Sequence, residues 1–299
     1  MNRKNSSGTM FKLSVISDEV SQDLERIISF AKKFNLDGIE IRTLWNKKPH
    51  ELVNYASRIR KMLNESGLAV SAIASPFFKA DIDREDEYTQ HIDILKKCIE
   101  LAKSLDTDIV RGFTFWRKAP LDEYLEIIVE KFSKPLDIVE NEGIILAIEN
   151  EYSTFVNNAR RLSQFLKAIE SKNVKALWDP GNDIFDPEGE IPYPDGYNMI
   201  KDNIVHIHVK DGVRKGKSGK PETRPVGEGE VNYREQIRAL IRDRYKGYLS
   251  LETHWRPVGE LPEELLLKPG GAGFSAMGEY ASEICMQKLI NIINSVRED

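Results

Sequence analysis

Residues 203–210 read NIVHIHVK, and this stretch decides how the rest of the chain is interpreted. In a β-strand, successive side chains point to opposite faces. The aliphatic residues at alternate positions would therefore share one face, and His206, His208 and Lys210 would share the other. A half-buried surface strand has this pattern, and so does a strand that lines a functional cavity. The rest of the sequence has to separate the two interpretations.

Short runs of β-branched and apolar residues alternate with amphipathic stretches along the whole chain. The expected strands are Leu13–Ser17, Gly38–Arg42, Ala69–Ala74, Asp108–Phe113, Ile144–Glu149, Val174–Asp179, Ile204–Val209 and Tyr248–Glu252. Between them, stretches such as residues 91–105 carry apolar residues at spacings of three and four, and a last helix is expected at about 278–295. Eight strand–helix units predict an α/β fold, a closed (β/α)8 TIM barrel. An open doubly wound sheet is the alternative, but no GxGxxG follows the first strand.

The length suits one such barrel, since the chain has 299 residues and a typical (β/α)8 barrel has about 250. No linker or low-complexity tract divides it, so we expect a single domain over residues 11–299 after a disordered tail at residues 1–10. The longest segments without clear periodicity, at about 179–195, 211–231 and 253–277, all follow strands. They are expected as loops at the C-terminal face of the barrel, where enzymes of this fold build their sites.

Composition excludes several classes of function. Apolar residues make up 40% and charged residues 30%, which is typical of a globular enzyme with a core. The formal charge of −5 argues against a nucleic-acid partner, which requires a basic surface. No apolar run reaches the ~18 residues of a membrane span, and the start lacks the hydrophobic region of a signal peptide. The two cysteines are far apart, so we expect a reducing, cytoplasmic location. Because no apolar run could span a membrane, we also expect no membrane partner.

Four consecutive strands end in residues that can bind a metal. They are Glu149, Asp179, His208 and Glu252. Because the strands of a barrel are parallel, these side chains should meet at one face. Buried carboxylates that lie close together repel one another unless a cation compensates them. Three carboxylates and one imidazole form an oxygen-rich set, which suits Mn²⁺, Mg²⁺ or Co²⁺ better than a sulfur-rich zinc site does.

Each of these residues also has an ordinary structural interpretation. A single acidic residue at a strand end is usually a helix cap or the partner of a Lys or Arg. His206, taken alone, would be a hydrogen-bonded interior histidine. The coincidence on four consecutive strands favours the metal site. A structural ion-pair network in the mouth of the barrel is the remaining alternative.

Several short motifs, in this order, resemble a known family. They are DEV at 18–20, DGIEIR at 37–42, LAIEN at 146–150, WDPGN at 178–182, HIHVKD at 206–211 and GYLSLET at 247–253. The pattern is similar to the xylose isomerase-like TIM-barrel superfamily, and in particular to its sugar phosphate isomerases and epimerases. These include ketose 3-epimerases and hydroxypyruvate isomerase. The resemblance covers about residues 11–295.

The resemblance implies a site with one divalent metal ion, Mn²⁺ or Mg²⁺, with Co²⁺ or Zn²⁺ as further candidates. Its ligands would be Glu149, Asp179, His208 and Glu252. His206 lies one step deeper in its strand and would support the ligand. Lys210 and Arg214 would bind the substrate, Arg214 because it stands six residues past the ligand histidine. Asn182 stands where epimerases of free ketoses usually have a histidine, and it can form hydrogen bonds but cannot titrate near neutral pH.

The activity that the resemblance implies is isomerisation or epimerisation of a keto sugar, a sugar phosphate or a related hydroxy-keto compound. Glu149 and Glu252 would remove and return a proton through a metal-bound cis-enediolate. The alternative is a metal-dependent dehydratase of the inosose or 3-dehydroshikimate type, which would use the same ligands. The partner would be a small carbohydrate, and relatives are often homodimers or homotetramers.

Two further hypotheses rank below these. An AP endonuclease needs a three-metal cluster with several more histidines, whereas this chain has five in total. A non-catalytic binding barrel is not expected to keep an intact ligand set. Basic residues also follow several strands, namely Arg42, Lys79, Arg111, Arg117, Lys210, Arg214 and Arg256. Some of them are candidates for binding a substrate phosphate or carboxylate, but most are expected to be ordinary loop or surface charges.

Overall fold

Eight parallel strands form a closed barrel in the computed structural model, which describes residues 11–298. The predicted tail at residues 1–10 lies outside the described residues. The barrel strands are β1 (Lys12–Ile16), β2 (Gly38–Ile41), β3 (Ala69–Phe77), β4 (Ile109–Gly112), β5 (Ile145–Glu149), β6 (Val174–Trp178), β7 (Ile204–Val209) and β10 (Tyr248–Leu251). Their order around the barrel is β1-β10-β7-β6-β5-β4-β3-β2, and every neighbouring pair is parallel, including β2 with β1, which closes the barrel. The predicted (β/α)8 TIM barrel is confirmed.

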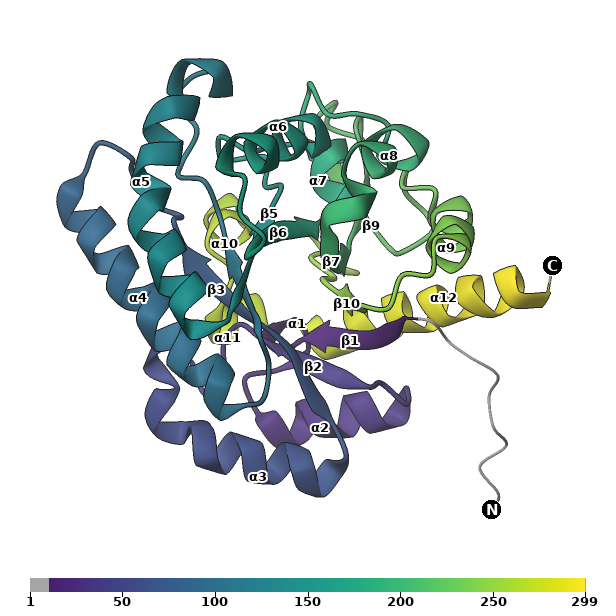
Figure 1. Cartoon of the computed structure of the whole chain (residues 1–299). Helices are drawn as coiled ribbons and strands as arrows, with labels where there is room; N and C mark the ends of the chain where they lie inside the picture. Colours follow the sequence, from purple (N-terminus) through teal and green to yellow (C-terminus); the bar gives the residue numbers. More distant parts are fainter. Residues whose placement is uncertain (1–10, 299) are drawn as a thin grey trace.

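Helices surround this barrel, as Figure 1 shows. The helices are α1 (Ser17–Val20), α2 (Leu24–Lys33), α3 (Ala56–Ser66), α4 (Glu85–Ser104), α5 (Leu121–Glu142), α6 (Ala159–Ile169), α7 (Pro180–Phe185), α8 (Tyr197–Ile200), α9 (Tyr233–Arg242), α10 (Glu263–Leu267), α11 (Gly271–Phe274) and α12 (Gly278–Glu298). Short 3₁₀ turns lie at Pro49–Glu51, Val53–Tyr55 and Lys201–Asn203. Within residues 11–298, no helix has both the length and the apolar character that a membrane span requires.

Local sequence signals explain where several helices begin and end. The side chain of Asn158 caps α6 by accepting a hydrogen bond from the backbone N–H of Arg161 at 3.0 Å. Helices α3 and α5 end at Gly67 and Gly143, which adopt left-handed φ values of 69° and 67°. A side chain there would be strained, so glycine is favoured at these helix ends.

The strand bounds agree closely with the sequence expectation, but the three long segments are more ordered than predicted. Strand β3 extends to Phe77, beyond the expected Ala74. The segment after β6 contains α7 and α8, and the segment after β10 contains α10 and α11. After β7, strands β8 (Asp211–Val213) and β9 (Glu222–Arg224) pair as an antiparallel hairpin. These short elements build the walls above the barrel.

Strand β7, which contains most of the NIVHIHVK stretch, directs its polar side chains into the barrel. His206 and His208 on β7 both contact Glu40 on β2, with Nε2 to carboxylate oxygen distances of 2.8 and 3.1 Å. Strands β7 and β2 are separated by β10 and β1 in the barrel order, so these contacts cross the interior. Ile207 and Val209 belong to the apolar core instead. Of the two interpretations of NIVHIHVK, a surface strand is therefore excluded, and the strand lines the interior of the barrel.

Candidate metal centre

The structure brings the four predicted ligands together at the C-terminal end of the strands. Glu149 ends β5, Asp179 follows β6, His208 lies on β7 and Glu252 follows β10. Their potential ligand atoms all lie within 4.8 Å of one another. All four side chains are buried, and none is more than 2% exposed. This geometry is what the strand-end pattern predicts.

The distances within the group fit a metal ion between the side chains. His208 Nδ1 lies 3.3 Å from Glu149 Oε1 and 3.5 Å from Glu252 Oε2. Ligand atoms at bond lengths of about 2.0–2.3 Å sit roughly 3–3.7 Å apart on neighbouring corners of a coordination shell. His208 Nδ1 is also buried without a hydrogen-bond partner. A buried nitrogen with two carboxylate oxygens at these separations is chemically suited to a divalent cation.

Glu40 orients the histidine from the opposite side. Its two carboxylate oxygens lie 3.1 Å from His208 Nε2 and 2.8 Å from His206 Nε2. A carboxylate on one ring nitrogen favours the proton there and leaves the other nitrogen free to bind a metal. His206 therefore contacts Glu40 below the site and does not line the cavity above it. Burial lowers the pKa of His208, but Glu40, Glu149 and Glu252 outweigh it and raise that pKa well above its ordinary value. The same carboxylates would attract a metal cation.

Asp179 has two separate roles for its two oxygens. Oδ1 caps α7 by accepting from the backbone N–H groups of Gly181 and Asn182 at 2.8 and 3.3 Å. Oδ2 lies 2.6 Å from Lys210 Nζ, which is also 3.0 Å from Glu252 Oε2. Burial raises the pKa of Asp179 to about 8, although Lys210 opposes the rise. The ion-pair alternative is thus partly realised, because Lys210 contacts Asp179 and Glu252, and Arg111 contacts Glu149.

Each glutamate of the group also contacts a buried arginine. Arg111 Nη1 lies 3.1 Å from Glu149 Oε2, and Arg42 Nη1 lies 2.7 Å from Glu252 Oε1. Each glutamate therefore presents one oxygen to His208 and the other to an arginine. The expectation that most of the basic residues are loop or surface charges is wrong. Those that are buried in the barrel mouth are Arg42, Arg111, Lys210, Arg256 and the side chain of Lys79.

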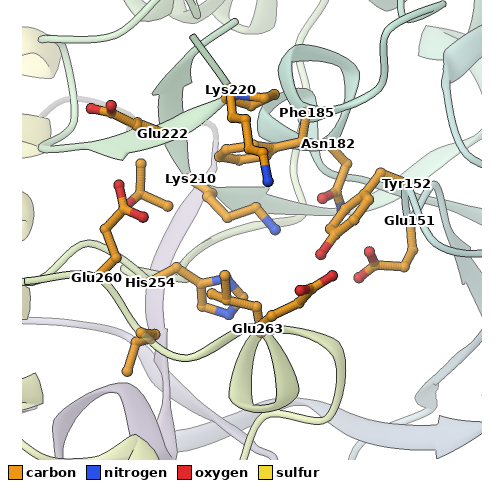
Figure 2. Close-up of a pocket in the computed structure, with 14 residues that line it drawn as sticks. Glu151, Tyr152, Asn182, Phe185, Lys210, Lys220, Glu222, His254, Glu260 and Glu263 are labelled. Carbon is orange, nitrogen blue, oxygen red and sulfur yellow. The ribbon is translucent and has the colours of Figure 1, made fainter. Parts of the chain in front are cut away.

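A cavity of about 290 Å³ lies above the four ligands, between the long segments that follow the strands. Asn182, Lys210 and His254 lie at its floor, next to the ligands. Figure 2 shows the ammonium groups of Lys210 and Lys220 and the hydroxyl of Tyr152 pointing into this space. The lining is rich in groups that hydrogen-bond, and the volume suits a small polar molecule.

The remaining predicted residues fall on both sides of the cavity boundary. Asn182 lines the cavity, and its Nδ2 donates to the backbone oxygen of Asn150 at 2.8 Å and to Asp179 Oδ2 at 3.2 Å. Its Oδ1 has no partner. Arg214 is not among the lining residues. Its guanidinium donates to the backbone oxygens of Asp186, Gly189 and Glu190, so the segment after β6 holds it away from the cavity.

Sequence reasoning assigned no role to two residues that the structure places at the site. Glu40 lies within the quoted DGIEIR motif and is the partner of both histidines of HIHVKD. Two buried histidines require a hydrogen-bond partner, and that requirement was the signal in the sequence that pointed to such a residue. His254 lines the cavity with its backbone at a left-handed φ of 45°, which is unusual for a residue other than glycine. No sequence pattern marks such a backbone conformation at a histidine.

Comparison with known proteins agrees with the fold. The family described as xylose isomerase-like TIM barrel matches residues 28–271. An inosose dehydratase of Bacillus velezensis is 25% identical over 202 residues, which are 61% of this chain and 66%, just under two thirds, of that protein. A fructoselysine 3-epimerase of Shigella flexneri is 23% identical over 255 residues, 77% of this chain and 84% of that protein. The solved structure of an L-ribulose 3-epimerase has a TM-score of 0.70 at 18% identity and covers 96% of both chains.

Proposed function

Because the chain belongs to the xylose isomerase-like TIM-barrel family, we propose that it is a divalent-metal-dependent enzyme acting on a small polyhydroxy ketone. The proposed reaction begins with removal of a proton from the carbon beside the carbonyl. Our first assignment is isomerisation or epimerisation of a keto sugar, a sugar phosphate or a related compound. The observation that carries this proposal is the convergence of three carboxylates on the unpartnered Nδ1 of His208, below a cavity lined by several hydrogen-bonding side chains.

The relatives support an enzyme with a carbohydrate substrate. They include a dehydratase named for inosose and an epimerase named for fructoselysine. An epimerisation next to a carbonyl and a dehydration of a hydroxy ketone share their first step, which is loss of a proton from the carbon beside the carbonyl. The proposal for this chain rests on that shared step.

The metal would be held by Glu149, Asp179, His208 and Glu252. When bound, it supplies a Lewis acid that polarises the carbonyl oxygen and a neighbouring hydroxyl of the substrate. Three oxygen ligands and one imidazole favour Mn²⁺ or Mg²⁺, with Co²⁺ and Zn²⁺ as further candidates. Asn182 and Lys210 are proposed to bind substrate oxygens, because both line the cavity beside these ligands.

Glu149 and Glu252 are proposed to move the proton. They flank His208 Nδ1 at 3.3 and 3.5 Å, so a substrate carbon above the site would lie between two carboxylates. One carboxylate can take the proton from one side and the other can return it from the opposite side, which inverts the carbon. Burial raises the pKa of Glu149, but His208 and Arg111 outweigh it and lower that pKa below its ordinary value. General acid–base catalysis of this kind typically contributes about 10²–10⁴-fold.

A dehydratase is the second candidate, and the position of Lys210 favours it. A dehydration expels a hydroxyl group, which leaves more readily when an acid protonates it. The ammonium of Lys210 lies at the floor of the cavity, 3.0 Å from Glu252 Oε2. It would be placed to stabilise the departing hydroxyl of a substrate bound above the ligands through a charged hydrogen bond.

Deuterium exchange tests the proposal and separates the two candidates. The protein with Mn²⁺ would be incubated in D₂O with keto sugars, their phosphates and inosose, and followed by NMR. Deuterium beside a carbonyl is expected, and an epimer or a dehydrated product assigns the reaction class. Glu149→Gln and Glu252→Gln should each abolish turnover while the circular dichroism spectrum is unchanged. Full activity in either variant would refute the proton-transfer role.

Metal analysis supplies an independent test of the centre. Purified protein should contain a divalent ion, and EDTA should remove the activity. A preparation without bound ion and with EDTA-insensitive turnover contradicts the proposal. A homodimeric or homotetrameric assembly and a cytoplasmic location are proposals that rest on the sequence alone.

A further inference from the structure

A second set of potential metal ligands lies beside the first. Glu19 from α1, Glu252 after β10 and His254 have ligand atoms within 4.8 Å of one another. Their exposed fractions are 0%, 2% and 8%. Glu252 belongs to both sets, with Oε2 facing His208 and Oε1 facing His254. We call Glu19, Glu252 and His254 the second trio.

His254 directs an unpartnered ring nitrogen at the two carboxylates of the second trio. Its Nε2 lies 3.4 Å from Glu19 Oε1 and 3.5 Å from Glu252 Oε1, and no hydrogen bond satisfies it. These separations are those of neighbouring ligand atoms around one cation. The trio thus repeats, on the other oxygen of Glu252, the arrangement that surrounds His208 Nδ1.

The guanidinium of Arg42 occupies the carboxylate oxygens of the second trio. Its Nη1 lies 2.7 Å from Glu252 Oε1, its Nη2 lies 2.9 Å from Glu19 Oε1, and its Nε lies 2.8 Å from Asp18 Oδ1. The ring of Phe274 covers it at 4.6 Å. The three donor atoms of one rigid, permanently charged fork therefore satisfy three buried carboxylates.

Further polar groups contact the other oxygens of Asp18 and Glu19. Arg256 Nη1 lies 3.7 Å from Glu19 Oε2, and the backbone N–H of His254 donates to the same oxygen at 3.2 Å. The hydroxyl of Thr43 donates to Asp18 Oδ2 at 2.8 Å. These contacts bind the rear oxygens of Asp18 and Glu19. The front oxygens, which face Arg42, are the ones that a cation would use.

We propose that Arg42 fills a latent second cation site, so that the protein binds one divalent ion and gains a second when the guanidinium is removed. The second ion would be held by Glu19, Glu252 and His254 and would share Glu252 with the first. A metal ion and a guanidinium cannot occupy the same two oxygens, because both are cations and both need direct contact. The inference rests on the proposed function only in that the first site binds a metal.

The presence of Arg42 in the place of a second metal ion has a consequence for the first site. Because Arg42 holds Oε1 of Glu252, that carboxylate is a one-oxygen ligand whose Oε2 is directed at His208. Arg42 is thus a positioning residue. It supplies a fixed charge whose presence does not depend on the supply of metal.

Counting bound ions tests the inference directly. Metal-free protein would be dialysed to equilibrium against Mn²⁺ and its content measured by mass spectrometry. We expect one ion per chain in the natural protein and two in Arg42→Ala. Electron paramagnetic resonance should change from the six-line spectrum of an isolated Mn²⁺ to that of a spin-coupled pair, because the two ions share Glu252.

Arg111 provides a matched control. It contacts Glu149 as Arg42 contacts Glu252, but its other partners are the backbone oxygens of Ser75 and Ala74. Among the residues that the structure describes, Glu149 belongs to no second group of ligands. Arg111→Ala should therefore keep one ion. The double variant Arg42→Ala, His254→Ala should return to one ion, because the trio loses its nitrogen.

The outcomes separate this inference from the proposed function. One ion in both the natural protein and Arg42→Ala overturns the inference and leaves the metal centre intact. No ion in the natural protein overturns both. Arg42→Ala removes the guanidinium that three buried carboxylates share, so its unfolding temperature should depend on Mn²⁺ more strongly than that of the natural protein. If this variant does not fold, Arg42→Gln retains neutral hydrogen-bond donors there, and one ion per chain in Arg42→Gln likewise overturns the inference.

Discussion

The two halves of the barrel contribute different things to the site. Strands β5, β6, β7 and β10 supply the four proposed ligands, whereas β1 to β4 and the residues that follow them supply most of the charges that contact those ligands. Lys210, which follows β7, is the exception, since it contacts Asp179 and Glu252. Glu40, Arg42 and Arg111 all come from this first half and contact His208, Glu252 and Glu149. The difference shows that the ligand set depends on its counter-charges, which lie far away in the sequence.

The first half does more than balance charge, because each of its contacts fixes one atom of a ligand. Glu40 fixes Nε2 of His208, and the two arginines fix the rear oxygen of each glutamate. The other oxygen of each glutamate faces His208 Nδ1, and on Glu252 this oxygen also contacts Lys210. Variants in the second half should therefore remove metal binding, whereas variants in the first half should weaken it.

Among the variants that compare the two halves of the barrel, Asp179→Asn should have the largest effect. The amide oxygen can still cap α7 at the position of Oδ1, but the proposed ligand oxygen Oδ2 is replaced by an amino group. Since a Lewis acid supplies several kcal/mol of charge stabilisation, turnover should fall on the order of 10³-fold or more. Mn²⁺ titration measures the loss of metal affinity, and steady-state kinetics measure the fall in turnover.

Asp183→Asn is the matched control in the same segment. Asp183 is fully buried, and its Oδ1 accepts from the backbone N–H of Ala159 at 3.0 Å. Burial raises its pKa well above the ordinary value, so an uncharged amide is a close substitute. It belongs to none of the ligand groups found within residues 11–298. Loss of metal from Asp183→Asn as severe as from Asp179→Asn would show that the fold of the segment, and not the ligand, explains the effect.

Glu40→Gln tests the first half of the barrel and should have an intermediate effect. The amide keeps the size of the side chain but loses the negative charge that orients both histidines. Replacing a carboxylate that supports a ligand histidine typically costs 10–100-fold in metal affinity, or about 1.4–2.7 kcal/mol. We expect a Kd for Mn²⁺ that is weaker by this factor, with binding still saturable. Affinity equal to that of the natural protein would break the proposed division between the two halves.

The sequence predicts the second half of the site better than the first, for a physical reason. The ligands end consecutive strands, so local alternation and the parallel geometry of a barrel already bring Glu149 and Asp179 together. The counter-charges pair across the barrel: Arg42 and Glu252 are 210 residues apart, and Glu40 and His206 are 166 apart. Periodicity predicts that a strand is buried, but it does not predict which charge lies opposite.

Arginine assignments show the same limit in both directions. Arg42 is one of seven basic residues of which most are expected to be ordinary loop or surface charges, yet it is 2% exposed in an ion-pair network. Arg214 was expected to bind substrate, yet its guanidinium is bound to backbone oxygens of the segment after β6. The destination of a long, flexible side chain depends on acceptors supplied by distant loops. Those loops carried no periodic signal in the sequence.

The stability of the first half should depend on pH through His91. Its Nδ1 accepts from the backbone N–H of Phe78 at 2.8 Å, and burial lowers its pKa to about 4. The unfolded chain therefore binds more protons than the folded chain between about pH 6.5 and 4, so stability falls as pH falls through this window. The loss between pH 7.5 and 5 should be about 2 kcal/mol, and His91→Gln should remove it. Urea unfolding at the two pH values measures it.

Asp211, in the second half, should act in the opposite direction. Burial raises its pKa to about 6, although four backbone N–H groups oppose the rise. The folded chain then binds more protons than the unfolded chain between about pH 4 and 6, so this carboxyl contributes stability that decreases as pH rises. Asp211→Asn should make the acid destabilisation steeper, whereas His91→Gln should make it shallower. Equal slopes in the two variants would contradict the assignment of either group.

Arg214→Ala should have the smallest effect, and it tests the resemblance against the observed geometry. The arginine is part-buried, and its three hydrogen bonds hold the segment after β6 from the outside of the cavity. If that position persists when substrate binds, the variant should lose roughly 1–2 kcal/mol of stability, and KM should change less than about twofold. A rise in KM of tenfold or more at unchanged unfolding temperature would instead mean that the side chain turns toward the substrate, as the family pattern implies. The comparison of KM with stability thus decides whether the loops above β6 and β7 take part in binding or only frame the cavity.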